Sequence, residues 1–159
     1  MTTRRVAERA GVSPGLVHYH VGSIEGLRRA AACEGARSLL EGPFREALEA
    51  PNLREGLLAF LLRLDLKPDY PGVVLLNEAL VAATHDAELR SDLATMFSTF
   101  RARLAERLSA QKGAHAGEAE ARALVLVAAV DGFLLQRALD PSLGAEQLIR
   151  GIEPFLEPQ

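Results

Sequence analysis

The sequence has little of several things on which many folds and active sites depend. A single cysteine, Cys33, among 159 residues excludes an intramolecular disulfide. Aromatic residues make up 5% of the chain and tryptophan is absent, which leaves few of the side chains that favour strands. The longest strongly apolar stretch, residues 123–130, is far too short to span a membrane, and no signal peptide follows Met1. We therefore expect a cytoplasmic protein without a membrane partner.

Sequence motifs of enzyme and cofactor sites are also missing. The chain contains no GxSxG, P-loop, GxGxxG, HExxH or CxxC pattern. His18 and His20 are two positions apart, so on a helix they face different directions and make poor joint metal ligands. The sequence predicts neither an enzyme nor a cofactor or metal site.

Helix formers are abundant, because leucine, alanine, arginine and glutamate dominate the composition. Proline, glycine and asparagine divide the helical pattern into about nine segments. We expect helices over residues 3–10, 14–20, 24–40, 43–50, 53–66, 73–84, 87–110, 118–139 and 145–156. This order predicts an all-α fold with two parts, a small N-terminal head, residues 1–27, and a larger C-terminal helical bundle, residues 28–159, which we call the body.

The charge is uneven along the chain, although the net charge is only -3. Residues 1–29 hold five arginines and two glutamates, a balance of +3, whereas the rest holds 13 basic and 19 acidic side chains, a balance of -6. A basic end on an acidic remainder is typical of a protein that meets a polyanion at one end, although ordinary solvated helices also reach such a balance.

Residues 3–20 have the pattern of two short helices joined by a tight turn. Gly11 ends the first helix, and Ser13 followed by Pro14 starts the second. Ala7 is small where the two helices must cross closely. The valines whose spacing points inward are Val6, Val12 and Val17. This is the geometry of a helix-turn-helix, whose second helix enters the major groove of DNA.

The same stretch resembles the DNA-binding domain of the tetracycline-repressor (TetR) family. The motif reads Val6-Ala7, Ala10-Gly11-Val12-Ser13, His18-Tyr19-His20, Gly22-Ser23-Ile24-Glu25 and Leu27. The resemblance implies a homodimeric transcriptional regulator, in most members a repressor, which binds a palindromic DNA operator and is released by a small apolar or amphipathic effector. The family's first helix has no counterpart here, Ile24 replaces a lysine and Val21 replaces a phenylalanine, so we expect the head to be incomplete.

By this resemblance the second short helix is the recognition helix. It implies that His18, Tyr19 and His20 bind mainly phosphates, whereas Gly15 and Leu16 lie near base edges. The first short helix would add phosphate contacts that carry no sequence information. The implied DNA-binding residues are Thr2, Thr3, Arg4, Ser13, Gly15, Leu16, His18, Tyr19 and His20.

Two polar residues, Asn77 and Glu78, interrupt an apolar segment in the body. Residues 73–84 are apolar on most sides, so we expect this helix to be buried. The two residues could anchor an effector in an apolar pocket; alternatively Glu78 reaches a helix edge or pairs with an arginine, because a lone buried carboxylate is costly. The candidate ligand-binding residues are Phe60, Leu64, Tyr70, Asn77, Glu78, Met96, Phe97 and Phe100, although an aromatic stripe of this kind is more often plain core.

Residues 118–139 are apolar on nearly all faces, so this helix must be covered on two sides. One side can pack within its own subunit. The other, with the stripe of residues 145–156, suits a symmetric four-helix dimer interface; the alternative is burial within one subunit. Residues 131–136 are similar to the dimerisation region of the TetR family. The candidate interface residues are Leu124, Val127, Asp131, Leu134, Leu135, Leu148, Ile152 and Phe155.

A second function is compatible with the same sequence. With an incomplete head, the chain could be a dimeric small-molecule-binding or interaction protein that no longer binds DNA. A test of DNA binding separates the two hypotheses.

Overall fold

The computed structural model describes residues 2–65, 71–110 and 116–156, and within these ranges it contains nine α-helices and no strand. The helices are α1 (Thr3–Ala10), α2 (Pro14–Val21), α3 (Ile24–Glu41), α4 (Pro43–Glu49), α5 (Leu53–Asp65), α6 (Pro71–Ala82), α7 (Ala87–Ser109), α8 (Ala116–Leu139) and α9 (Ala145–Leu156). The all-α class predicted from the sequence is confirmed. The main differences in boundaries are that α6 and α8 begin slightly earlier than predicted.

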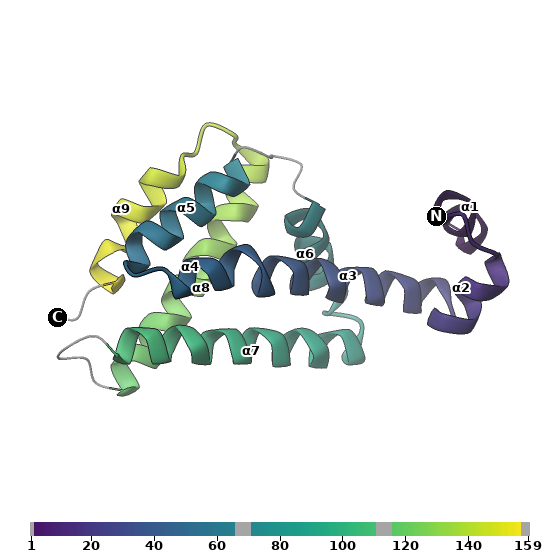
Figure 1. The fold of residues 1–159 in the computed structure, drawn as a ribbon, viewed down its shortest axis with the longest axis horizontal. Helices are drawn as coiled ribbons and strands as arrows, with labels where there is room; N and C mark the ends of the chain where they lie inside the picture. The colour runs from purple at the N-terminus through teal and green to yellow at the C-terminus, as the bar shows by residue number, and fades with distance from the viewer. Residues whose placement is uncertain (1, 66–70, 111–115, 157–159) are drawn as a thin grey trace.

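Figure 1 shows an elongated molecule with the head at one end, where α1 and α2 lie apart from the other helices. α3 begins beside α2 and runs into the body, where it packs against α6 and contacts α4 and α7. α5, α8 and α9 pack together at the other end of the body. The position of the head relative to the body therefore depends mainly on α3.

α7 connects the two sides of the body, because it packs on α8 and also contacts α3. Asp86 caps its start, where the carboxylate Oδ1 accepts a hydrogen bond from the Leu89 N–H at 3.0 Å. Its buried side chains repeat at steps of three and four positions, the spacing of one helix face. They are Leu89, Leu93, Phe97, Phe100, Leu104 and Leu108.

One hydrophobic core fills the body, with members from every helix between α3 and α9. The largest fully buried side chains are Leu57, Leu61, Leu104, Leu108, Leu126 and Ile149. Arginines tie helix ends around this core. Arg107 on α7 donates to the carbonyl oxygens of Leu48 and Ala50 at 3.3 and 3.1 Å and so satisfies the end of α4. Arg122 on α8 is buried and donates to the Phe155 carbonyl of α9 at 2.9 Å.

α6 is less buried than its composition predicts. Leu76 and Ala79 are buried, but Val74, Leu80 and Val81 are 49, 37 and 69% exposed. The expectation that this helix is covered on most sides is therefore wrong. The physical reason is that α6 packs along α3 and touches α7, and within the described ranges no helix packs closely over its outer side.

Candidate functional site

The head has the helix-turn-helix geometry that its sequence predicts. Thr2 Oγ1 accepts a hydrogen bond from the Arg5 N–H at 3.4 Å and caps α1. Ser13 Oγ accepts one from the Leu16 N–H at 3.2 Å and caps α2. Between the two helices, Gly11 has a φ of 68°, the left-handed conformation that makes the turn tight. Because a hydroxyl that accepts one hydrogen bond can still donate another, both caps remain able to bind a phosphate oxygen.

The residues implied to contact DNA are exposed, apart from Thr3, which is half-buried. Tyr19 is 83% exposed, and its ring packs edge-on against the His20 ring with centroids 5.2 Å apart. A Cβ atom on Gly15 would come no closer than 4.0 Å to another residue, the Ser13 Oγ, so the open side of α2 has room for a close approach. Arg4 is strongly exposed and pairs with Glu8 at 3.0 Å, an interaction that solvent weakens.

The head has almost no core of its own. Among its described residues only Ala7 is buried, and α2 has no buried side chain. Val6 and Val17 are half-buried, whereas Val12 is 37% exposed, which corrects its predicted inward position. Val12 lies in the turn, where neither helix covers it. Because few apolar groups are buried, we expect the head to open locally more readily than the body.

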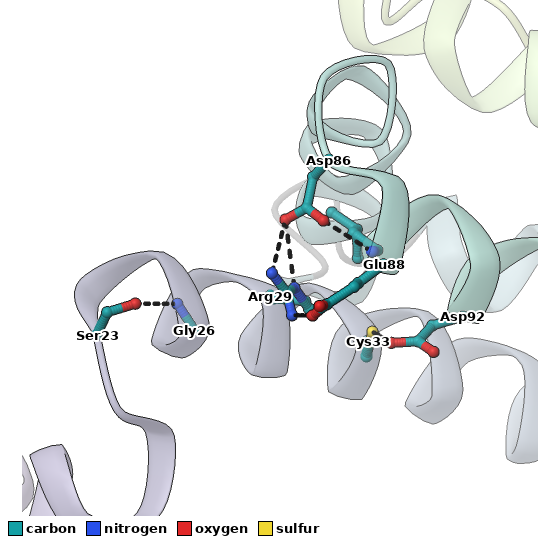
Figure 2. Close-up of polar contacts among 8 residues, drawn as sticks. Ser23, Gly26, Arg29, Cys33, Asp86, Glu88 and Asp92 are labelled. Atoms are coloured by element: carbon teal, nitrogen blue, oxygen red, sulfur yellow. Dashed lines mark hydrogen bonds and ion pairs between the residues drawn. The ribbon is translucent and has the colours of Figure 1, made fainter.

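An ion-pair cluster joins the N-terminal part of α3, next to the head, to the start of α7 (Figure 2). Arg29 on α3 donates from Nε to Asp86 Oδ2 at 3.2 Å and also pairs with Glu88. Asp86 is the N-cap of α7, and the hydrogen bond from the Leu89 N–H, together with the charge of Arg29, lowers the pKa of its carboxyl. The start of α3 is thus tied to the start of α7, so a change in the angle between these helices would move the head.

Cys33 lies further along α3, with its Sγ 4.0 Å from Asp92 Oδ2 on α7 (Figure 2). The side chain is half-buried and packs against the core. Burial, together with the charge of Asp92, raises the pKa of the thiol. A thiol with a raised pKa is a poor nucleophile near neutral pH, so Cys33 acts as a packing residue.

A small cavity lies in the middle of the body, among α4, α5, α6, α7 and α8. Its lining consists of Phe44, Phe60, Leu76, Phe97, Phe100, Val127, Val130, Asp131 and Leu134. The Phe44 ring lies 4.7 Å from the Phe60 ring and 4.2 Å from the Phe100 ring, measured between centroids. The free volume is about 20 Å³, room for about one water molecule. Asp131 is the single polar side chain of the lining, and burial raises its pKa to about 6.

A groove on the surface between α3 and α7 adjoins this cavity. Its lining consists of Arg37, Glu41, Thr95, Met96, Thr99, Phe100 and Arg103, and its free volume is about 160 Å³. Phe100 lines both spaces. Of the candidate ligand-binding residues, Phe60, Phe97 and Phe100 meet at the cavity and Met96 lies in the groove.

The two polar residues considered as effector anchors lie elsewhere. Glu78 is exposed and lines a separate cleft between α3 and α6, near Arg29, which agrees with the alternative of a helix-edge position. Asn77 is half-buried and does not line the cavity. Tyr70 and the side chain of Leu64 lie outside the part of the chain that the structure describes. Asp131, a candidate interface residue, lines this cavity and is also partly exposed. The signal that could have indicated its place in the cavity is a lone acid in an apolar helix.

α8 and α9 both carry large apolar side chains that are open to solvent in the single chain. Leu124 and Leu135 on α8 are 56 and 53% exposed, and Phe155 on α9 is 38% exposed. Sequence reasoning missed Val125 and Leu139, which are 40 and 83% exposed. Positions 121, 125, 128, 132, 135 and 139 alternate by four and three, the spacing of a seam between two helices, and this signal was present in the sequence.

The other candidate interface residues do not belong to these exposed side chains. Val127, Leu134 and Ile152 are 6, 7 and 4% exposed and belong to the core of the single chain, and Leu148 is half-buried against it. The structure thus moves them from the predicted interface to the interior. The reason is that α7 and α9 cover one side of α8, which a pattern apolar on nearly all faces could not indicate.

In the described ranges, no three side chains of His, Cys, Asp or Glu come together in a way that could hold a metal ion. None of the helices described is both long enough and apolar enough to cross a membrane.

A capped helix-turn-helix carried by a long helix on an all-helical body defines a helical DNA-binding regulator. The family model described as the tetracyclin repressor-like C-terminal domain matches residues 49–157 of this chain. The chain therefore belongs to the TetR family of transcriptional regulators. Among curated protein sequences, none is significantly similar to it.

Solved structures of transcriptional regulators are similar over almost the whole chain. The regulator SCO7518 from Streptomyces coelicolor A3(2) has a TM-score of 0.73 at 22% identity, with 98% of this chain and 86% of that chain covered. The regulator RHA1_ro04179 from Rhodococcus sp. Rha1 has a TM-score of 0.71 at 26% identity, with 98% and 82% covered. A TetR-family regulator from Rhodococcus sp. has a TM-score of 0.68 at 21% identity, with 98% and 86% covered. Similarity at these low identities supports the shared fold.

Proposed function

We propose that the protein is a homodimeric, ligand-responsive repressor in the cytoplasm, which binds a palindromic operator through its two heads and is released by a small apolar or amphipathic effector. The observation that carries DNA binding is the exposed start of α2, where a capped helix N-terminus, an open glycine and exposed aromatic and histidine side chains are presented together. Backbone N–H groups at such an end bind phosphate, and a nearby glycine lets the helix approach the groove closely.

DNA binding is tested by fluorescence anisotropy on the chain's own promoter region and on a scrambled duplex, at about 50 and about 200 mM salt. The test variant is Gly15→Leu, which places a side chain where the DNA would lie. The matched control is Gly117→Leu, because both glycines are the second residue of an exposed helix start and neither Cβ would meet a close neighbour. We expect Gly15→Leu to lose about tenfold or more in specific affinity and the control to lose none. Equal binding by both variants would exclude α2 as the recognition helix.

The homodimer is supported by the exposed apolar side chains of α8 and α9. Its seam combines leucine and valine with small residues at Ala121, Ala128 and Gly132, which would let a second α8 approach closely. A self-complementary face of this kind suits a two-fold axis. Two heads carried on one dimer would then meet two half-sites of a palindrome.

The dimer is tested by light scattering against the monomer mass of 17.1 kDa. Leu135→Glu should give monomers, because it would place a charge in the seam. Leu62→Glu is the matched control, since Leu62 is a similarly exposed leucine on α5. A wild-type monomer, or a dimer that survives Leu135→Glu, would show that the seam is not the interface.

The release mechanism is supported by the position of the cavity and groove beneath α3. A ligand shifts an equilibrium only as far as it binds one state better than the other. An effector in the groove between α3 and α7 would favour a wider separation of these helices, which Arg29 and Asp86 otherwise hold together. The heads of the dimer would then no longer match the operator.

The alternative is a dimeric small-molecule-binding or interaction protein without DNA binding. The observation that favours it is the poor core of the head, in which α2 buries no side chain. Absence of specific, salt-sensitive DNA binding in the same anisotropy experiment, together with an intact dimer, would select this function.

A further inference from the structure

The body cavity has an unusual composition for a piece of plain core. Four phenylalanine rings from α4, α5 and α7 surround it, and one carboxyl group, that of Asp131, lines it from α8. Among the described residues, no hydrogen-bond donor and no ion-pair partner reaches this carboxyl. Arg101 on α7 acts on it only through its more distant charge, while α4, α5 and α6 face it with Phe44, Phe60 and Leu76.

Asp131 is partly buried, and no donor or cation of the described residues replaces the water that this burial removes. Taking a charge out of water is costly unless an opposite charge or several hydrogen-bond donors replace the water. Burial accordingly raises the pKa of Asp131 to about 6, yet near neutral pH the group is still mostly ionised. The cavity therefore combines a negative charge with aromatic rings, and both attract an organic cation.

The size of the ligand follows from the neighbouring groove. The cavity alone has about 20 Å³ of free volume, whereas the groove has about 160 Å³, and only the Phe100 ring is shared between their walls. A rotation of this ring would join the two spaces. The joined volume is close to that of an engineered apolar cavity of about 150 Å³ that holds benzene. A single aromatic ring with a short arm matches this space.

We propose that the effector is an apolar or aromatic amine, whose cationic nitrogen pairs with Asp131 in the cavity and whose apolar part displaces the Phe100 ring and occupies the groove between α3 and α7. This inference rests on the proposed function and adds the chemical class of the effector. Because Phe100 lies on α7 and the groove reaches Arg37 on α3, the same displacement acts on the helix pair that carries the head.

The proposal is tested by isothermal titration calorimetry on the full chain with three probes of similar shape, 3-phenylpropylamine, 3-phenyl-1-propanol and 3-phenylpropanoate. We expect the amine to bind wild type about tenfold or more tightly than the alcohol, and the acid to bind least. Asp131→Asn should abolish the preference for the amine. The control Glu120→Gln, which removes an exposed carboxylate from the same helix, should keep it. Circular dichroism confirms that each variant is folded.

A pH series separates direct pairing from an indirect effect. The amine stays charged between about pH 7.5 and about pH 5, whereas Asp131 becomes mostly protonated, so its affinity for wild type should fall about tenfold over this range. Asp131→Asn should show no such fall. Equal affinities for amine and alcohol, tightest binding of the acid, an amine preference that survives Asp131→Asn, or no binding of any probe would each overturn the proposal. DNA binding is measured separately. Specific DNA binding without a preference for the amine would mean a regulator with another class of effector, whereas absence of DNA binding would mean that the chain is not a regulator.

Discussion

Replacing Asp131 by asparagine should change how the stability of the protein depends on pH. The carboxyl has an ordinary pKa of 3.8 in the unfolded chain and about 6 in the folded one, because burial disfavours its charged form. Between these two values the folded protein holds a proton that the unfolded chain has released. The stabilising contribution of the protonated group is therefore fully present below about pH 4 and is lost as pH rises through about 6.

The magnitude follows from the size of the shift. At 1.36 kcal/mol for each pKa unit, a rise from 3.8 to about 6 corresponds to about 3 kcal/mol of lost stability above pH 7. This is a large part of the stability of a domain of this size. Asparagine has no proton to lose, so Asp131→Asn should escape the loss.

The assay is urea unfolding followed by circular dichroism, at pH values from about 4 to about 8, on wild type and Asp131→Asn. The quantity to compare is the difference in the free energy of unfolding between wild type and Asp131→Asn. Other carboxyls, such as Asp86 and Asp140 with their lowered pKa values, contribute equally to both proteins and cancel in this difference. Relative to wild type, the variant should gain about 2 kcal/mol as pH rises from 4 to 7, because the carboxyl of the unfolded chain is already partly ionised at pH 4. A difference that stays constant with pH, or that changes in favour of wild type, would refute the assignment of a partly buried carboxyl without a protein partner.

Three further substitutions test other parts of the structure. Ser13→Ala removes the N-cap of α2 and should weaken the head by about 1 kcal/mol, seen as faster amide hydrogen exchange in α2 with unchanged exchange in the body; unchanged exchange in α2 would contradict it. Gly26→Ala would place a Cβ atom 2.1 Å from the Val21 carbonyl oxygen, so the head must shift on α3; specific DNA affinity should fall while the melting of the body stays the same. Leu108→Ala, at a fully buried position of α7, should lower the free energy of unfolding in urea by about 2–5 kcal/mol. A loss below about 1 kcal/mol would contradict this, because it would mean that the neighbouring side chains fill the cavity left by the substitution.

The head shows what short-range sequence signals can determine. Gly11, Ser13 and Pro14 each act on their own backbone or on the next turn of helix, so the two helices and the turn between them could be read directly. The same holds for α7, whose stripe of buried residues repeats at the helical period. These features need no information about the rest of the chain.

The cavity and the open face of α8 depend on which helices lie beside which. Asp131 and Leu135 are one turn apart on the same side of α8, yet Asp131 lines the cavity and is partly covered, whereas Leu135 is 53% exposed. The difference depends on where the neighbouring helices pack along α8. Because α8 is apolar on nearly all faces, its sequence does not indicate which of its positions the other helices cover. For the same reason the exposed side of α6 could not be foreseen.

The sequence by itself thus determined the helices, the helix-turn-helix and the family resemblance. The reason is that backbone preferences and helical periodicity depend on residues that are close together in the chain. Only the tertiary structure decided that Phe44, Phe60 and Phe100 from three helices line one cavity with Asp131, and that Arg29 ties α3 to the start of α7. Contacts between residues far apart in the chain depend on how helices pack, and packing is a property of the whole core rather than of any one segment.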